Sequence, residues 1–399
     1  MATRSPVRPA PRVETLGGFL YRPEVRQVVY QVLLVAAVVL ALAWIVNNVA
    51  VNLRRQNIAS GFDFLDRTSG FDVSQSLIAY SNASTYGRAF WVGLLNTLLV
   101  AVLGIIAASV IGFIVGIARL SSNWLIARLA TVYVEVVRNV PLLLQLFFWY
   151  FAVLKNLPGP RQSYAIPGGG FFNVRGLYLP LPVPQPGFGY VALAFAAGVI
   201  GALMLARWAA RRQDTTGVRP PVLAPSLALI VGLPLAAFVV TGLPLGIDFP
   251  ALKGFNFAGG LVIQPELMAL LLGLSIYTAS YIAEIVRGGI VGVPRGQREA
   301  ALALGLTNAQ ALRLVIIPQA LRLIIPPLTS QYLNLTKNSS LAVAIGYPDF
   351  VSVFTGTVLN QTGQAIEVIL MTMGVFLTIS LLTSAGMNWF NRRAALVER

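Results

Sequence analysis

A run of polar side chains interrupts an otherwise apolar part of the chain near residue 335. The stretch LTSQYLNLTKNSSLAVAIGYP follows Pro326-Pro327 and carries amides, hydroxyls and one ammonium group, that of Lys337. So many polar groups are unsuited to lipid, and they are expected to face a partner helix, a cavity or water. Serine and threonine also join packed helices through hydrogen bonds, so a structural and a binding role both stay open for them.

The side chains in this run that could hold a polar solute are Lys337, Asn334, Asn338, Ser339 and Ser340. Lys337 has the clearest requirement, because a buried ammonium needs an anion or water and no acid lies within one helical turn of it. An anionic solute would satisfy it. The alternative is a permanent ion pair with an acid elsewhere, such as Glu135, Glu284 or Glu367, or with another subunit.

Two glutamate–arginine pairs also lie in apolar surroundings. Glu135 precedes Arg138 by three residues, and Glu284 precedes Arg287 by three. Side chains three apart share one helix face, so each pair is expected to form an ion pair. Such a pair needs no substrate.

The segment EAALALGLTNAQALRLVIIP, residues 299–318, connects two apolar stretches and predicts two short helices joined by a hinge. Its first helix is expected to open at Glu299, Ala300 and Ala301. Gly305 is expected to end it, because glycine readily takes the left-handed C-cap conformation. Thr307 and Gln310 have the spacing of a capping box that starts a second helix, and Pro318 is expected to mark a bend into the next span. An ordered connector of this kind predicts a docking surface.

Composition places the chain in a membrane. It has 399 residues, of which 56% are hydrophobic and 11% charged, against roughly 25% charged in soluble domains. Without cysteine or histidine, it has no disulfide, thiolate nucleophile or histidine-ligated metal. The net charge is +15, but no basic stripe interleaved with aromatics points to nucleic acid. The sequence also lacks the phosphate-binding pattern G-x-x-x-x-G-K-[ST].

The apolar stretches predict an all-α polytopic membrane protein. Eight transmembrane helices are expected near 27–47, 89–118, 130–154, 188–207, 222–243, 264–287, 319–345 and 366–390. Arginines concentrate in alternate loops, so both termini and the 299–318 segment are predicted to be cytoplasmic.

The chain resembles the integral membrane subunits of ABC importers, in their polar-amino-acid branch. The 299–318 segment is similar to that family's EAA loop, with Val315 and Ile317 where isoleucine and leucine are usual. The stretches YVEVVRNVPLLLQLFFWY, YIAEIVRGGI followed by VPRGQREAA, and QYLNLTKNSSLA are also similar. Val140 replaces the usual threonine before Pro141. The resemblance covers roughly 89–154 and 264–390, and long versions resemble general L-amino-acid and glutamate/glutamine/aspartate importers of Gram-negative bacteria.

The resemblance implies a five-helix permease core in the bacterial inner membrane. The expected organisation is a cytoplasmic basic tail (1–26), a first transmembrane helix (27–47), a periplasmic loop (48–88) and the importer domain (89–390), which contains an inserted periplasmic loop and helical hairpin at about 155–243. The hairpin proper, 188–243, has no intramembrane charge.

The resemblance also implies how the protein works. The coupling residues would be Glu299, Ala300, Ala301, Gly305 and Pro318, fitting a groove on a separate cytoplasmic ATPase subunit that binds the ATP. No cofactor is expected in this chain. A second permease subunit, identical or not, would complete the path for an L-amino acid delivered by a periplasmic binding protein. The solute carboxylate would meet Lys337.

Two rival classes remain. An ion-gradient-driven transporter or channel would use Glu135, Glu284 and Lys337 as a relay, but no internal repeat supports it. A membrane scaffold without transport would have an apolar interface in place of the polar run.

Overall fold

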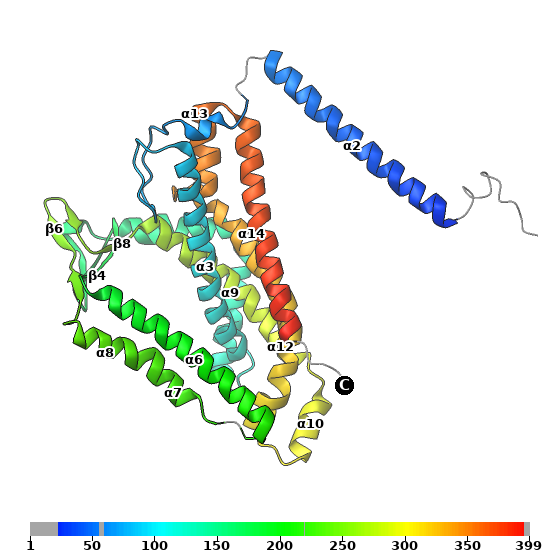
Figure 1. Ribbon diagram of the computed structural model, residues 1–399, viewed down its shortest axis with the longest axis vertical. Helices are drawn as coiled ribbons and strands as arrows, with labels where there is room; N and C mark the ends of the chain where they lie inside the picture. Colours follow the sequence, from blue (N-terminus) through cyan, green and yellow to red (C-terminus); the bar gives the residue numbers. More distant parts are fainter. Residues whose placement is uncertain (1–22, 56–59, 219, 395–399) are drawn as a thin grey trace, which may run out of the picture.

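The computed structural model describes residues 23–55, 60–218 and 220–394, and most of these residues are helical (Figure 1). Within those ranges seven helices are long and apolar enough to cross a membrane, and a bent pair of helices supplies an eighth span. The prediction of a mostly helical polytopic membrane protein with about eight spans is therefore confirmed. Most of the predicted basic tail, 1–26, lies outside the described residues.

The first helix, α2 (Pro23–Arg55), is longer than the predicted 27–47 and stands apart from the bundle (Figure 1). No glycine or proline occurs between Gln27 and Ser60, so nothing ends the helix at the predicted boundary. No residue of its apolar window, Arg26–Val49, is buried.

The centre of the bundle is formed by α3 (Tyr86–Ala118) and α9 (Pro265–Val291). On α3, small residues recur every four positions at Gly104, Ala108, Gly112 and Gly116, and all are buried. A Cβ added at Gly112 would lie 2.6 Å from the Cβ of Ile282 on α9. Small residues at this spacing let two membrane helices approach closely, so α3 and α9 form a rigid pair.

The third predicted span, 130–154, is broken rather than continuous. It consists of α4 (Trp124–Asn139) and a second segment of α5 (Leu142–Phe147), η2 (Phe148–Val153) and η3 (Leu154–Asn156), with a bend of 105° between the two. Val140 is extended, as the residue before a proline tends to be. The side-chain amide of Gln145 donates to the carbonyls of Val137 and Val140, both at 2.9 Å. These bonds satisfy the carbonyls that the break leaves open.

Short strands, absent from the prediction, lie in the segments on either side of the helical hairpin. They are β1 (Tyr164–Ile166), β2 (Gly170–Asn173), β3 (Gly176–Leu179), β4 (Leu181–Pro184), β5 (Leu245–Asp248), β6 (Ala251–Lys253), β7 (Asn256–Ala258) and β8 (Leu261–Ile263). Antiparallel pairing gives one four-stranded sheet, β1-β2-β3-β8, and two two-stranded sheets, β4-β5 and β6-β7. Strands on the two sides of the hairpin thus pair with each other.

The hairpin itself consists of α6 (Phe188–Thr216) and a second helical arm of α7 (Leu223–Leu227), η5 (Ala228–Gly232) and α8 (Leu233–Val240). The two arms pack closely, since a Cβ at Gly198 would collide with the carbonyl oxygen of Leu229. Both arms lean away from α3 and α9 (Figure 1), which leaves α8 without a buried residue.

The last two spans are α12 (Ile317–Asn338), extended by η7 (Ser339–Ile345), and α14 (Ala365–Ala394). Between them lies an unpredicted helical piece of η8 (Val351–Val358) and α13 (Leu359–Thr362). The chain entering η8 is fixed to α3. The amide of Asn96 donates to the carbonyl of Pro348 at 2.9 Å, and the backbone N–H of Phe350 donates to Thr97 Oγ1 at 3.0 Å.

Candidate functional site

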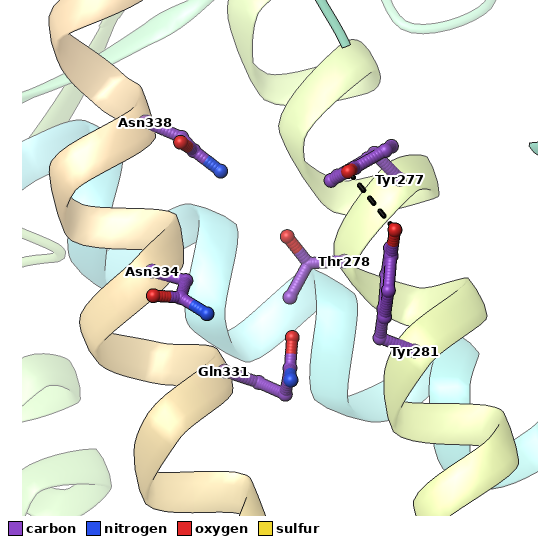
Figure 2. A pocket seen from close by; sticks show the side chains of 6 residues that line it. All are labelled: Tyr277, Thr278, Tyr281, Gln331, Asn334 and Asn338. Carbon is purple, nitrogen blue, oxygen red and sulfur yellow. Dashed lines mark hydrogen bonds between the residues drawn. The ribbon is translucent and has the colours of Figure 1, made fainter. Parts of the chain in front are cut away.

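A polar cavity of about 280 Å³ lies between α9 and α12 (Figure 2). Its lining side chains are Tyr277, Thr278 and Tyr281 from α9, and Gln331, Asn334 and Asn338 from α12. The α12 residues are spaced by three and four positions, so they share one helix face. All six side chains are polar and uncharged.

The amides on the α12 side have unused hydrogen-bonding capacity. Within the described part of the chain, the side chains of Gln331, Asn334 and Asn338 make no hydrogen bond, whereas Tyr277 and Tyr281 bond to each other at 3.0 Å between their hydroxyl oxygens (Figure 2). An amide offers two N–H donors and one carbonyl acceptor. Three such groups facing one cavity can therefore meet both the acceptors and the donors of a small polar solute.

The predicted substrate-path residues divide into two groups. Asn334 and Asn338 line the cavity. Ser339 is fully buried and donates to the carbonyl of Thr336 at 2.7 Å, and Ser340 donates to the carbonyl of Lys337 at 2.7 Å. These two serines stabilise the end of α12 through bonds to its own backbone.

Lys337 is exposed and does not line the cavity. None of the described carboxylates pairs with it. Among the partners that the sequence left open, Glu284 is engaged by two arginines, and Glu367 accepts a bond from the backbone N–H of Gly61 at 2.7 Å.

Sequence reasoning missed the α9 side of the cavity. Tyr277, Thr278 and Tyr281 occur in the stretch YTASY, next to the Glu284–Arg287 pair. The sequence feature that could have identified this side is the spacing of the two tyrosines, because residues four apart lie on one helix face.

A second cavity, of about 490 Å³, is lined largely by charged side chains. Its lining residues are Arg119, Val134, Glu135, Arg138, Asn139, Tyr281 and Glu284. The predicted pair of Glu284 and Arg287 is present, with 2.5 Å between Oε1 and Nη2, and Arg119 also contacts the Glu284 carboxylate.

The predicted pair of Glu135 and Arg138 is wrong for the described residues, because no ion pair joins them. The guanidinium of Arg138 lies instead over the ring of Tyr281, 4.9 Å from its centroid. The partner of Arg138 is thus the ring of Tyr281 on the neighbouring helix α9, and not the carboxylate of Glu135 on its own helix α4.

The predicted connector forms two helices joined at a glycine. The first, α10 (Arg295–Ala303), begins four residues before Glu299, directly after Pro294. Gly305 ends it with φ +81°, and the N–H of Leu306 donates to the carbonyl of Ala301 at 3.2 Å. The capping box is confirmed, since Gln310 N donates to Thr307 Oγ1 at 3.3 Å and Thr307 N to the Gln310 side chain at 2.9 Å.

The second helix of the connector continues into the membrane span. The helix α11 (Asn308–Ala311) passes through the π-helical turn η6 (Leu312–Ile316) into α12, as part of one helical run, Asn308–Ile345. The predicted bend at Pro318 is therefore replaced by a π-helical turn that ends two residues before it, at Ile316. Such single π-helical turns occur inside otherwise continuous α-helices.

The surface of α10 is open to a partner. Glu299, Ala300 and Ala303 are exposed, and Leu304 is 83% exposed beyond the end of the helix. Ala301 is buried against its own chain and so does not belong to that surface. Helix α10 lies at the lower end of the molecule in the view, away from the strands at its left edge (Figure 1).

Together, the fold and the two cavities define a polytopic membrane protein with a polar interior and an exposed connector. A match to the family described as binding-protein-dependent transport system inner membrane component spans residues 108–396. The chain belongs to this family.

The similarity to known relatives extends over nearly the whole chain. The general L-amino acid transport system permease protein AapQ of Rhizobium johnstonii is 56% identical over 380 residues, which covers 95% of this chain and 95% of the relative. The putative amino-acid ABC transporter permease protein YhdX of Escherichia coli is 56% identical over 379 residues, covering 94% of this chain and 96% of the relative. These similarities confirm the resemblance to ABC importer permeases and do not favour the ion-gradient alternative.

One solved structure is also similar, the crystal structure of an amino acid ABC transporter with histidines. The match has a TM-score of 0.46 and 22% sequence identity, and it spans 77% of this chain and 95% of the chain in that structure.

Proposed function

We propose that this chain forms half of the translocation path of an ATP-driven importer of L-amino acids in the bacterial inner membrane. The observation that carries the proposal is the cavity between α9 and α12, where Gln331, Asn334 and Asn338 present amides with no protein partner among the described residues. Every free amino acid offers a carboxylate acceptor and an ammonium donor. Amides bind both without selecting one side chain, and the names of the relatives support this class of solute.

Lys337 is proposed to meet the solute carboxylate on the face that a second permease subunit completes. It follows Asn334 by three residues, so the two side chains lie on neighbouring parts of one helix surface. Its ammonium is exposed and unpaired within the described residues. A charge at membrane depth requires water or a counter-charge, and a passing carboxylate supplies one.

The chemical energy is proposed to come from a separate ATPase subunit that binds the exposed surface of α10 and the glycine hinge behind it. Gly305 and Pro318 shape that connector, while Glu299 and Ala300 contact the partner. Both termini and α10 are then cytoplasmic, and the strands lie in the periplasm, where a binding protein delivers the solute. The inserted segment and first helix are additions to a five-helix core.

Site-directed variants of the assembled complex in proteoliposomes test the proposed path. Replacing Asn334 and Asn338 with alanine is expected to weaken uptake of all transported amino acids while basal ATP hydrolysis continues. Lys337→Met is expected to do the same. Thr378→Ala is the matched control, because Thr378 is an exposed polar residue of α14 that lines neither cavity. Unchanged uptake kinetics in both path variants would contradict the proposed site.

A further inference from the structure

The two cavities have one lining residue in common, Tyr281. Its ring borders the uncharged cavity between α9 and α12. It also borders the charged cavity, whose remaining lining residues come from α4 and α9 and from Arg119, directly after α3. Tyr281 therefore stands at the boundary between the two cavities.

Two contacts hold the ring in this position. The hydroxyl of Tyr281 bonds to that of Tyr277, with 3.0 Å between the oxygens, and the guanidinium of Arg138 covers the ring at 4.9 Å. Tyr277 and Tyr281 lie one turn apart on α9, so a movement of α9 as a unit leaves the hydrogen bond between them intact. Arg138 stands on α4, so its contact depends on how α4 and α9 are placed relative to each other.

Of these two helices, α4 is the less tightly packed, and the hydroxyl of Tyr133 joins it to α9 by donating to the carbonyl of Ile276 at 2.7 Å. Helix α9 is locked to α3 by glycine contacts at Gly112 and Gly116. Helix α4 buries only Ala130 and Val134, and it ends at the 105° break, one residue after Arg138. A displacement of α4 at this break would withdraw the guanidinium from the ring without disturbing the α3–α9 pair.

We propose that Tyr281 is the barrier between the solute cavity and the charged cavity, and that Arg138 is the latch that keeps it closed. The inference rests on the proposed transport function. When α4 swings at the break, the latch opens, the ring rotates and the solute enters the charged cavity. There the carboxylates of Glu135 and Glu284 and the arginines face its ammonium and carboxylate. The first cavity, at about 280 Å³, is close to the lower end of the roughly 300–1,000 Å³ of ordinary ligand pockets, as suits a small solute.

The proposed barrier is tested by measuring the efflux of solute through the complex in the absence of ATP. The complete complex is placed in liposomes loaded with radiolabelled L-glutamine and sucrose, and efflux of both is followed. Wild-type vesicles are expected to retain both solutes. Tyr281→Ala should release glutamine at least about tenfold faster, the change that a barrier lower by about 1.4 kcal/mol produces, while sucrose stays inside.

Three further variants locate the barrier. Tyr281→Phe keeps the ring and its cation contact, and it should remain tight. Arg138→Met removes the latch but leaves the ring, so it should leak at an intermediate rate and serves also if Tyr281→Ala fails to assemble. Tyr190→Ala is the control, because Tyr190 is an exposed tyrosine of α6 that lines neither cavity, and it should remain tight.

The outcomes separate this inference from the proposed function. ATP-driven glutamine uptake by the wild type establishes transport independently of any leak. Given that uptake, the barrier assignment is overturned if assembled Tyr281→Ala and Arg138→Met are as tight as the wild type, or if Tyr190→Ala leaks as fast as Tyr281→Ala.

Discussion

Leu179 and Leu261 lie directly opposite each other on the antiparallel strands β3 and β8, although the whole helical hairpin separates them along the chain. Closer to the hairpin, the backbone N–H of Gln185 donates to the carbonyl of Pro244 at 3.1 Å. The chain therefore enters and leaves the inserted segment at adjacent positions, both at the Leu179–Leu261 pair and, nearer the hairpin, at the Gln185–Pro244 bond.

This pairing predicts that the insertion can be removed in two steps. The first deletion takes out residues 186–243 and joins Gln185 to Pro244 with a short linker. The second removes 180–260 and joins Leu179 to Leu261 with Asn-Gly, the two-residue turn that suits an antiparallel hairpin. Because α6 and α8 lean away from the core, both variants are expected to insert and to retain part of the ATP-driven uptake. Failure of α9, α12 and α14 to insert would show that the hairpin belongs to the core fold.

Local patterns explain which parts of the connector were predictable. The cap at Thr307, its partner Gln310 and the left-handed Gly305 are fixed by neighbours within a few residues, and all three were predicted from sequence. The strands were not, because Leu177 and its partner Ile263 are separated along the chain by the whole hairpin.

The cavities show the same distinction. The amides of Asn334 and Asn338 were identified from composition alone, since polar groups are conspicuous in an apolar span. The partner of Arg138 was not, because the choice between Glu135 on its own helix and Tyr281 on another depends on the 105° break. Pro141 indicates that a break is available, but its angle comes from packing and from the bonds of Gln145.

The glycine hinge predicts a loss of coupling without a loss of folding. Gly305→Val introduces a β-branched side chain at φ +81°, where the left-handed conformation costs about 1–2 kcal/mol. No atom lies within 4 Å of the added Cβ, so the cost comes from the backbone alone. We expect normal membrane insertion, loss of co-purifying ATPase and loss of uptake.

The matched control for the hinge is Gly374→Ala in α14, away from the connector. Gly374 has an ordinary helical backbone and equally free space around it, so alanine should be tolerated there. Normal ATPase retention and uptake in Gly305→Val would contradict the coupling role of the connector.

Asp349 predicts a pH-dependent stability. Its side chain is fully buried in the segment between Ile345 and η8, where one oxygen accepts from Ser352 N at 2.9 Å and the other has no hydrogen-bond partner among the described residues. Burial raises the pKa of Asp349 to about 7, above its unfolded value of about 3.9. The folded state therefore disfavours the charged form, and stability falls as pH rises between these two values.

Thermal unfolding of the wild type and Asp349→Asn between pH 5 and pH 8 measures this effect. The wild type should lose stability relative to the variant as pH rises, by at most about 1.4 kcal/mol per pH unit. Parallel curves for the two proteins would show that Asp349 does not titrate in this range.

Topology is directly measurable because the chain contains no cysteine. A single cysteine at exposed Ala303 in α10 and another at Gly254, between β6 and β7, report opposite ends of the molecule. In intact spheroplasts a membrane-impermeant maleimide should label Gly254→Cys at once and Ala303→Cys only after lysis. The reverse pattern would contradict the proposed cytoplasmic position of the connector.

The energy source tests the central claim most directly. Uptake of radiolabelled L-glutamine is measured in proteoliposomes that hold either this chain alone or its complex with the ATPase, the second permease subunit and the binding protein. The proposed function predicts uptake only by the complete complex, only with ATP, and unaffected by proton or sodium gradients. Uptake by the purified chain alone, driven by either gradient, would contradict it.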